Sequence, residues 1–600
     1  MSTAFCFCTL GDFSSIVSFM RKRSDLIRQE LSKRIHQACE QALSLEEIYD
    51  QLVEPPNLDL GDLAFGCFGL AKLLKKAPPQ IASDLKNKIA ADNWLETIHA
   101  VGPYLNFRLS LTAFTQSILQ PIQDGSFFKQ SLVQTTSKTM VEYSQPNTHK
   151  ELHVGHMRNA CLGDAVVRVL RYAGFEVISS TFPGDVGTHV AKCLWYLKFH
   201  NQEPIPESGK GEWLGKIYSK AHLKLEDEEA TPKGEENKRQ LTEILHQLEA
   251  KKGDYFEQWK VTREWSIELM KEAYKWAGIT FDQWYWESEV DSASVQYVKE
   301  LLAQGKLQKS DGAVGMDLSS ENMGFCLLLK SDGAGLYATK DIELAKRKFQ
   351  DFKIDKSIYV VDMRQALHFK QVFKVLENLG FEQAKNCFHL QYNFVELPDG
   401  AMSSRKGNIV PLMKLVHGME NMVRTKYMSK YESEWTSEEV QLVCSQVAQG
   451  AIKYGMVKID NNKKIVFDMD EWLKIDGDSG PFIQYSAARI NSLCRKFEFQ
   501  NSNTTINWSL LSHKAERNIL QALLGFHSVV LQSAETYRPS VLCTYLYDLA
   551  KRFNLFYHEC SIGQAETPEL KNARLALGYC TGEVLKKGLS LIGIPTPERM

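Results

Sequence analysis

His153 and His156 are the residues whose type and spacing most clearly suggest chemistry. They lie in the sequence His153-Val-Gly-His156, after a polar loop that carries Pro146 and at the start of a run with apolar residues at helical spacing. The first turn of a helix presents unpaired N–H groups and the positive end of a dipole, which together bind phosphate. Two imidazoles add donors to phosphate oxygens as charge develops on them. Gly155 lets a flat base or a ribose approach the backbone closely.

A metal site is the alternative for these two histidines. Two histidines three residues apart could bind zinc, but no cysteine or carboxylate cluster of ligand spacing lies near them. We therefore expect no protein-bound metal here.

A second stretch, Asp399-Gly-Ala-Met-Ser-Ser-Arg-Lys-Gly-Asn408, follows an apolar strand that we predict over Phe388 to Leu397. Its hydroxyl and cationic side chains, Ser403, Ser404, Arg405 and Lys406, suit the binding of a triphosphate whose charge is moving. Taken alone this signal is weak, because surface loops often have such a composition.

The elements that must position these residues form a strand–helix–strand unit. Thr139 to Tyr143 is apolar and rich in strand formers, the helical spacing then runs to Ala173, Gly174 ends it, and Phe175 to Ser179 reads as a second strand. Such a unit builds a parallel sheet, and ligands bind at the carboxyl ends of its strands. Ser357 to Val361 is a further buried strand of the parallel type, and Phe325 to Lys330 is a plain buried strand.

The pattern divides the chain into four parts. We predict a disordered extension over residues 1–20, a small α/β domain over 21–130, a Rossmann-like catalytic domain over 131–415 and an all-α bundle over 416–600. In the N-terminal domain we predict a helix over 24–43, a helix that ends at the prolines near Pro78, and a strand over 102–107. The C-terminal helices are expected at 440–458, 515–536, 545–559 and 569–591.

Two further stretches of the catalytic domain stand out by their composition. The charged insertion at about 203–252 has no strand pattern and is typical of a solvated helical face or a loop. Ile279 to Asp291 is aromatic and acidic, with Trp284, Trp286, Glu287 and Glu289, and is either core or the wall of a pocket for a cation.

Composition excludes several classes of protein. The net charge is −2, so any nucleic-acid site must be a local patch. The 13 cysteines are scattered without a Cys-x-x-Cys pair, which indicates reduced thiols and a cytoplasmic protein. No apolar run approaches the roughly 20 residues of a membrane span. The first residues lack the basic region of a secretory signal, and Met20 is an alternative start.

The two loops together resemble the HIGH and KMSKS signatures of class I aminoacyl-tRNA synthetases, the second as the variant Ala401 to Arg405. The chain resembles the arginyl-tRNA synthetases in particular, from about Leu52 to Met600. The residues that carry this resemblance are Glu142-Tyr-Ser-Gln-Pro-Asn147, Tyr337-Ala-Thr-Lys-Asp341, Gln365-Ala-Leu-His368, the Met-Ser-x-Arg-Lys-Gly arrangement and the terminal Ile594-Pro-Thr-Pro-Glu-Arg-Met600.

The resemblance implies ligation of L-arginine to tRNA(Arg) through an arginyl-adenylate, with ATP as substrate and Mg²⁺ as cofactor. His153 and His156 would stabilise the α-phosphate, and Ser403, Ser404, Arg405 and Lys406 would hold the departing pyrophosphate. Ala401 and Ser404 stand where lysines often occur in the signature. The family implies a compensating basic residue before the histidines and a requirement for bound tRNA in the first step. Lys150 fits that place, with His149 beside it, although Lys406 could also supply the charge.

The implied arginine pocket needs a carboxylate that faces the planar fork of a guanidinium. Asp341 is our choice, with Tyr337 one helical turn away, and an N-cap role is the alternative for Asp341. Asn147 and Gln365 are implied to hold the α-amino and carboxylate groups, and Glu142 could add negative charge. The ATP-binding residues that we expect are His153, Gly155, His156, Gly184, Asp185, Met402 and Lys406.

The resemblance also implies two contacts with tRNA. The N-terminal domain would contact its outer corner, unless the domain is only a structural appendage. The C-terminal bundle would bind the anticodon, with Tyr485 and Tyr557 as stacking aromatics and Met600 nearby. Both tyrosines could equally be packing residues.

Three other functions compete with this one. A cysteinyl-tRNA synthetase would need patterned zinc ligands, and a non-catalytic tRNA-binding paralogue would not need His153, His156, Asp341 and Lys406. A nucleotidyltransferase of the same superfamily would have no use for the long helical domain. We expect a monomer without membrane attachment.

Overall fold

The computed structural model describes residues 25–397, 400–401, 410–501 and 506–600. The predicted extension at 1–20 and the predicted loop residues Met402, Ser403, Ser404, Arg405 and Lys406 lie outside these described residues. No helix in the described ranges is long and apolar enough to cross a membrane.

A five-stranded parallel sheet lies near the centre of the molecule. Its spatial order is β12-β11-β5-β6-β7, so the first strand of the unit has neighbours on both sides. The strands are β5 (Lys138–Glu142), β6 (Glu176–Thr181), β7 (Gln283–Trp284), β11 (Lys356–Asp362) and β12 (Cys387–Tyr392). The strand order reverses between β5 and β11, and such a switch point opens a crevice at the carboxyl ends of the strands. The predicted Rossmann-like sheet is confirmed.

Helix α8 (Val154–Ala173) follows β5 and packs on this sheet. It ends at Gly174, whose φ of 113° lies in the left-handed region that favours glycine. Its other side packs against helices of the C-terminal part, which is why polar residues such as Arg158, Asn159 and Asp164 on it are buried as well as the apolar ones.

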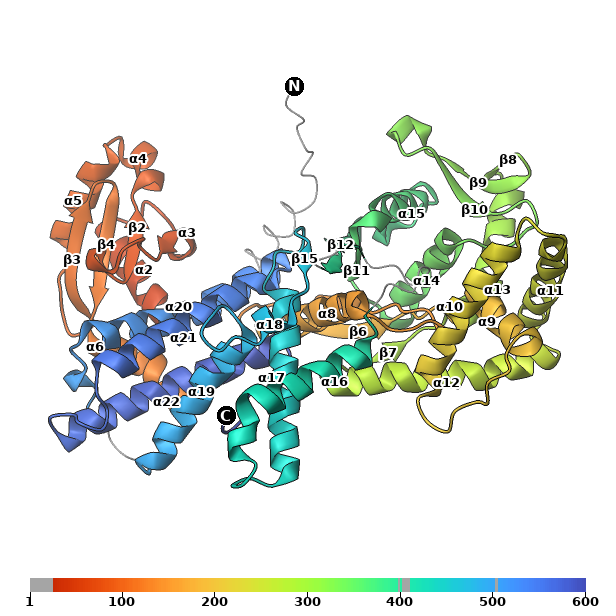
Figure 1. Ribbon diagram of the computed structural model, residues 1–600. Helices are drawn as coiled ribbons and strands as arrows, with labels where there is room; N and C mark the ends of the chain where they lie inside the picture. Colours follow the sequence, from red (N-terminus) through yellow and green to blue (C-terminus); the bar gives the residue numbers. More distant parts are fainter. Residues whose placement is uncertain (1–24, 398–399, 402–409, 502–505) are drawn as a thin grey trace.

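The charged insertion is helical and belongs to a larger helical unit than the sequence predicts. It consists of α9 (Thr188–Phe199), α10 (Lys210–Glu228), α11 (Pro232–Glu249) and α12 (Asp254–Ala277). Val190, Leu194, Trp195 and Ile244 are part of its own apolar core. In Figure 1 the N-terminal domain and helix α11 lie at opposite ends of the molecule, with α8 and β6 between them.

A second sheet and three helices also belong to the catalytic part. Helices α13 (Glu287–Ala303), α14 (Tyr337–Phe352) and α15 (Ala366–Asn378) lie around a small antiparallel sheet of β8 (Gln308–Ser310), β9 (Ala313–Asp317) and β10 (Phe325–Leu329). The strand predicted over 325–330 therefore exists, but in this separate sheet. The apolar run predicted as one strand over 388–397 divides into β12 and β13 (Val395–Leu397). Between them, the backbone N–H of Asn393 donates to the carbonyl of Asn461 at 2.8 Å.

The N-terminal domain combines a four-stranded antiparallel sheet of order β1-β2-β4-β3 with helices. Its elements are α2 (Leu26–Ala38), α3 (Leu45–Gln51), β1 (Leu52–Val53), β2 (Leu63–Gly66), α4 (Phe68–Leu74), α5 (Pro78–Lys88), β3 (Leu95–Val101) and β4 (Tyr104–Leu109). The helix predicted before the prolines is α4, which ends at Leu74, and Pro78 is the first residue of the next helix, α5. Proline suits that position because its missing N–H would be unpaired there in any case. Short helices α6 (Leu111–Phe114) and α7 (Gln120–Gln123) then lead to the sheet.

The C-terminal part is an all-α bundle apart from one short strand, as expected. It contains α16 (Leu412–Val423), α17 (Ser437–Val457), α18 (Met469–Trp472), α19 (Gly480–Lys496), α20 (Lys514–Thr536), α21 (Pro539–Glu559) and α22 (Pro568–Leu591). Helix α19 was not predicted, and α21 begins earlier than expected, again at a proline. The short strand β15 (Ile465–Val466) pairs in parallel with β13, which also pairs with β14 (Gly400–Ala401).

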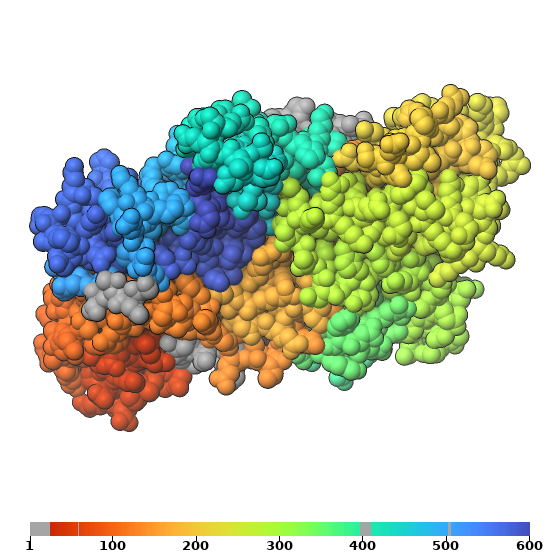
Figure 2. Space-filling model, turned by 90° about the horizontal axis from the view of Figure 1, so that it is seen from below, coloured from red at the N-terminus to blue at the C-terminus, as the bar shows by residue number. Residues whose placement is uncertain are grey.

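The N-terminal domain rests on the C-terminal helices rather than on the catalytic sheet. Arg517 at the start of α20 contacts the carboxylate of Asp62, which is fully buried, and donates to the carbonyl of Leu109 at 2.6 Å. Figure 2 shows the red and orange N-terminal surface against the blue C-terminal helices. The N-terminal domain and the C-terminal bundle thus meet in space.

Candidate active site

A cavity of about 760 Å³ opens at the carboxyl ends of β5, β11 and β12. Most of the predicted substrate and catalytic residues line it, although they come from five separate stretches of sequence. They are Glu142, Asn147, His153, Gly155, His156, Gly184, Tyr337, Asp341 and Gln365.

His153 and His156 lie at the start of α8 with their rings 3.9 Å apart. His153 is the N-cap residue, and its Nδ1 accepts the backbone N–H of Gly155 at 3.1 Å. The Nδ1 of His156 accepts the backbone N–H of His153, also at 3.1 Å. Because each Nδ1 is an acceptor, Nε2 of each neutral ring carries the proton. The capping arrangement therefore leaves two neighbouring N–H donors at a helix N-terminus that lines the cavity.

Both imidazoles are neutral near physiological pH. Burial lowers the pKa of His153 to about 4, and the charges of Arg364 and Lys150 act in the same direction. Burial also lowers the pKa of His156 well below its ordinary value, with His153 and Lys150 adding to the effect. These rings therefore act on a ligand as neutral donors rather than as cations.

Asp341 lies on α14, four residues after Tyr337, and both side chains line the cavity. The N-cap of α14 is Leu336, so the alternative that Asp341 caps its helix is wrong. The carboxylate Oδ2 of Asp341 instead lies 2.6 Å from Nε2 of His368, on α15. Tyr337 is 66% exposed, at the mouth of the cavity.

Glu287 is a cavity residue that the sequence marked only as part of an acidic and aromatic stretch. It is the first residue of α13, is only 5% exposed, and its Oε1 accepts from the Nζ of Lys340 at 2.6 Å. Its Oε2 is buried without a hydrogen-bond partner in the described structure. A Cβ on Gly184 would stand 3.1 Å from this oxygen and 2.3 Å from Oδ1 of Asn147, so a glycine is needed there. The acidic and aromatic stretch around Glu287 was the only sequence signal for this wall of the cavity.

The cations of the described cavity wall are both paired with carboxylates. Lys340 contacts Glu287 and, at 3.1 Å, Asp291, while Arg364 contacts Asp362 at 2.8 Å. Glu142, at the end of β5, is buried and contacts the fully buried amine of Lys348. Each cation of the described cavity wall thus has a carboxylate partner. Oε2 of Glu287, by contrast, has no hydrogen-bond partner in the described structure.

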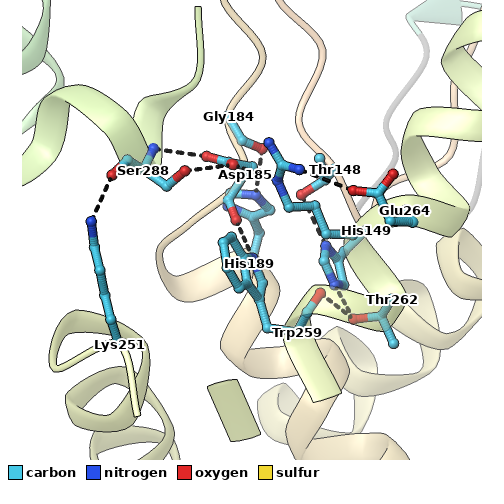
Figure 3. Close-up of polar contacts among 11 residues, drawn as sticks. Thr148, His149, Gly184, Asp185, His189, Lys251, Trp259, Thr262, Glu264 and Ser288 are labelled. Carbon is cyan, nitrogen blue, oxygen red and sulfur yellow. Dashed lines mark hydrogen bonds and ion pairs between the residues drawn. The ribbon is translucent and has the colours of Figure 1, made fainter. Parts of the chain in front are cut away.

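Asp185 does not lie where the sequence placed it. Its carboxylate accepts from Nε of Arg263 at 2.7 Å and from the backbone N–H and hydroxyl of Ser288 at 2.8 Å each. Figure 3 shows Asp185 facing Ser288, beside His189 and Trp259. It is fully buried and is not part of the cavity lining. In this structure Asp185 joins α12 and α13 to the loop after β6, instead of facing a ribose.

His149 and Lys150 also lie outside the cavity lining. His149 is fully buried, with Nε2 2.8 Å from the hydroxyl of Thr262 and Nδ1 2.9 Å from that of Thr148, as Figure 3 shows. Burial lowers its pKa to about 3. The ammonium of Lys150 lies over the ring of Tyr218, 5.1 Å from its centre.

Tyr485 and Tyr557 come together on the C-terminal bundle, about the guanidinium of Arg489. The guanidinium lies 4.7 Å from the centre of the Tyr485 ring and 5.3 Å from that of Tyr557. Its NH2 group also donates to the hydroxyl of Tyr485 at 3.0 Å. Tyr557 is 39% exposed, and Met600 is partly buried against the core. Tyr485, Arg489 and Tyr557 thus form a cluster of two aromatic rings and a cation at the surface of the bundle.

Three family models match the chain in order. The "Arginyl tRNA synthetase N terminal domain" matches residues 27–109, the "tRNA synthetases class I (R), catalytic domain" residues 119–469, and the "DALR anticodon binding domain" residues 483–600. The catalytic model thus includes the sheet, the cavity, α16 and α17.

Whole-chain comparisons agree with these matches. The chain is 63% identical over 557 residues to an arginine–tRNA ligase of Bdellovibrio bacteriovorus, covering 93% of this chain and 95% of that one. It is 35% identical over 560 residues to the arginine–tRNA ligase of Clostridium perfringens, covering 93% and 97%. The structure resembles Thermus thermophilus arginyl-tRNA synthetase with a TM-score of 0.78 and 29% identity, covering 96% of this chain and 100% of the other. The chain belongs to the arginyl-tRNA synthetase family, the class I enzymes that use ATP to attach arginine to tRNA in translation.

Proposed function

We propose that the cavity binds ATP at the His153 and His156 end and arginine at the Asp341 and Glu287 end. The arginine carboxylate then attacks the α-phosphate, pyrophosphate leaves, and arginyl-adenylate forms. In the second step the 2′-hydroxyl of the terminal adenosine of tRNA(Arg) attacks the arginyl carbonyl, and AMP leaves. No covalent bond to the enzyme is needed, so catalysis consists of positioning and charge stabilisation.

The pair of Nε2–H donors at the start of α8 is the observation that carries this proposal. Negative charge on the α-phosphate oxygens grows in the transition state, and donors that are already oriented stabilise it without reorganisation. Neutral rings keep this function over the whole physiological pH range. Gly155 leaves room at the same turn for the nucleotide.

Two carboxylates supply the specificity for arginine. A guanidinium presents its N–H groups in a planar fork, and Asp341 and the free Oε2 of Glu287 line the same cavity. Tyr337 adds an acceptor at the mouth. Asn147 and Gln365 bind the α-amino and carboxylate groups, and Glu142 contributes negative charge from the end of β5.

The leaving pyrophosphate needs positive charge that the described cavity wall does not offer freely. We assign the binding of pyrophosphate to the hydroxyls of Ser403 and Ser404 and to the positive charges of Arg405 and Lys406. Met402 would lie beside the nucleotide, and Lys150 is a further source of charge. No cluster of three metal-ligating side chains occurs among the residues with described positions. Mg²⁺ therefore enters this proposal only as an ion carried by the phosphates of ATP, and no step depends on a resident site.

The outer domains bind tRNA(Arg). The domain predicted at 21–130 contacts its outer corner, and the bundle predicted at 416–600 binds the anticodon, with Tyr485, Tyr557 and Arg489 as a stacking surface for splayed bases. The protein acts as a monomer in the cytoplasm. The free thiols of all described cysteines suit a reducing compartment.

Amino-acid-dependent pyrophosphate exchange, run with and without tRNA(Arg), tests the proposal. Arginine should support exchange, whereas lysine and citrulline should not, because lysine lacks the planar fork and citrulline lacks the charge. Exchange with citrulline as fast as with arginine would rule out the two carboxylates as the specificity determinants.

A further inference from the structure

Arg158 is a buried cation on α8, two residues after His156. It is 1% exposed and forms no ion pair with any described residue. Burial lowers its pKa to about 10, against the raising effect of Tyr392, Asp362 and Asp460. A guanidinium buried without a carboxylate depends on its neutral hydrogen-bond acceptors, because leaving it unsolvated is costly.

Those acceptors are four backbone carbonyls in two segments far from Arg158 in sequence. Its NH2 group donates to Lys463 at 2.9 Å, Asn461 at 3.2 Å and Asp460 at 3.4 Å, all in the turn that follows α17. Its NH1 group donates to Phe394 at 3.4 Å, between β12 and β13. One guanidinium thus joins the helix that begins at His153 to both of these segments.

The C-terminal bundle holds the turn at 460–463 in place. The amide of Asn461 donates to the carbonyl of Tyr537 at 3.0 Å, and Asp460 lies 3.5 Å from the guanidinium of Arg538. Tyr537 and Arg538 form the turn between α20 and α21. The chain of contacts therefore runs from α20–α21 through the 460–463 turn to Arg158 and the first turn of α8.

We propose that Arg158 is a positioning residue for adenylate formation. Through its contacts, the positions of His153 and His156 depend on the position of the 460–463 turn. If the turn moved away, the guanidinium would lose three of its four acceptors while still buried. The energetic cost of that loss ties the two segments together. This inference rests on the role proposed above for the two histidines.

Arg158→Lys is the sharpest test, because it keeps the charge and removes the fork that spans several carbonyls. Asn461→Ala is a milder second variant, since it removes only the side-chain bond from the turn to Tyr537. Arg168→Lys is a matched control on the same helix: Arg168 pairs with Asp164 at 2.8 Å and touches neither segment. All variants are compared with wild type in arginine-dependent pyrophosphate exchange in the presence of tRNA, with rates divided by titrated active sites.

We expect Arg158→Lys to lower kcat per active site on the order of 10- to 100-fold, the effect of a small misplacement of catalytic groups. The KM for arginine should stay within about twofold of wild type, because the arginine-binding carboxylates are on other elements. Asn461→Ala should lower kcat less, and the double variant should lose less than the product of the two single effects, since both act through one turn. Arg168→Lys should resemble wild type.

Normal kcat per active site in Arg158→Lys, even with a lowered melting temperature, would show that Arg158 is only a structural residue. Independent, multiplicative losses in the double variant would show that the two contacts do not form one chain. His156→Ala belongs in the same series. If its kcat is normal, the proposed role of the histidines fails, whereas a loss in His156→Ala without one in Arg158→Lys overturns this inference alone.

Discussion

Nε2 of His368 lies 2.6 Å from Oδ2 of Asp341, so a histidine on α15 holds the carboxylate that we assign to the guanidinium of arginine. Burial by itself would lower the pKa of His368, but the hydrogen bond and the charge of Asp341 outweigh it and raise that pKa above the ordinary value. Protonated His368 and bound arginine therefore compete for the same negative charge.

This competition predicts a pH dependence of arginine binding. Because the folded-state pKa of His368 is raised, its contact with Asp341 stabilises the fold at acidic pH and loses that contribution as pH rises through the raised pKa. We expect the KM for arginine to rise as pH falls from about 8 to about 6, where histidine titrates. In His368→Gln this dependence should disappear. An unchanged pH profile of arginine KM in the variant would show that another group titrates.

Asp341→Asn should weaken arginine recognition selectively. The change keeps the size of the side chain but removes its charge and one acceptor. We expect kcat/KM for arginine to fall by about 2–4 kcal/mol, the range for breaking a buried charged pair. The KM for ATP should change little. A normal arginine KM with only a lowered melting temperature would remove Asp341 from the arginine site.

Glu287→Gln should also raise the KM for arginine, because it removes the charge of the unpartnered Oε2 in the cavity. Asp291→Asn is the matched control: Asp291 also pairs with Lys340, at 3.1 Å, but does not line the cavity. We expect kcat/KM for arginine to fall in Glu287→Gln by a factor that corresponds to about 2 kcal/mol or more of transition-state stabilisation. The fall in Asp291→Asn should be much smaller. Equal effects of the two variants would mean that the ion pair with Lys340, rather than contact with arginine, is what matters.

His156→Ala and His153→Ala should each slow adenylate formation far more than they weaken ATP binding. Loss of one oriented donor typically lowers kcat by about 10²–10³-fold. Because the pKa values of both rings lie far below neutrality, the wild-type rate should show no ionisation of these residues above about pH 6. Single-turnover activation at the wild-type rate, with the fold intact, would make them structural histidines.

Tyr557→Ala should raise the KM for tRNA(Arg) without changing that for arginine. Stacking of a base on an aromatic ring contributes about 1–3 kcal/mol. Tyr557→Phe keeps the ring and serves as the control, and it should behave like wild type. If tRNA binding is unaffected by Tyr557→Ala but the melting temperature falls, the ring only packs on Arg489.

Hydrophobic periodicity and the positions of glycine and proline were enough to predict α8, the parallel sheet and most C-terminal helices. Their signals are local: helical spacing, a terminal Gly174, and runs of strand formers. The helix predicted before the prolines is α4, but α5 was not predicted, because a proline can follow one helix or begin the next and Pro78 here begins α5. The break between β12 and β13 was missed because it depends on Asn393 bonding to Asn461, which no local pattern reveals.

The candidate site divides in the same way. His153, His156 and Asp341 stand at recognisable positions, but Asp185 does not, because its partners Arg263 and Ser288 lie 78 and 103 residues away. Glu287 lay in a stretch that fitted a core or a pocket wall equally well. Only the three-dimensional structure, in which Glu287 lines the cavity and its Oε2 lies beside Gly184, distinguishes the two.

The contact of Asp62 with Arg517 has a consequence for the order in which the chain is made. Asp62 is fully buried, and the arginine that neutralises it lies 455 residues later. At about 5–20 residues per second, a ribosome needs roughly 20–90 s to travel that distance. During this interval the N-terminal domain has left the ribosome while the surface that will meet α20 is still open to water. The nascent chain therefore passes through a long period in which the N-terminal domain has been made but α20 has not. Any chaperone that covers this surface must leave before Arg517 can bind Asp62.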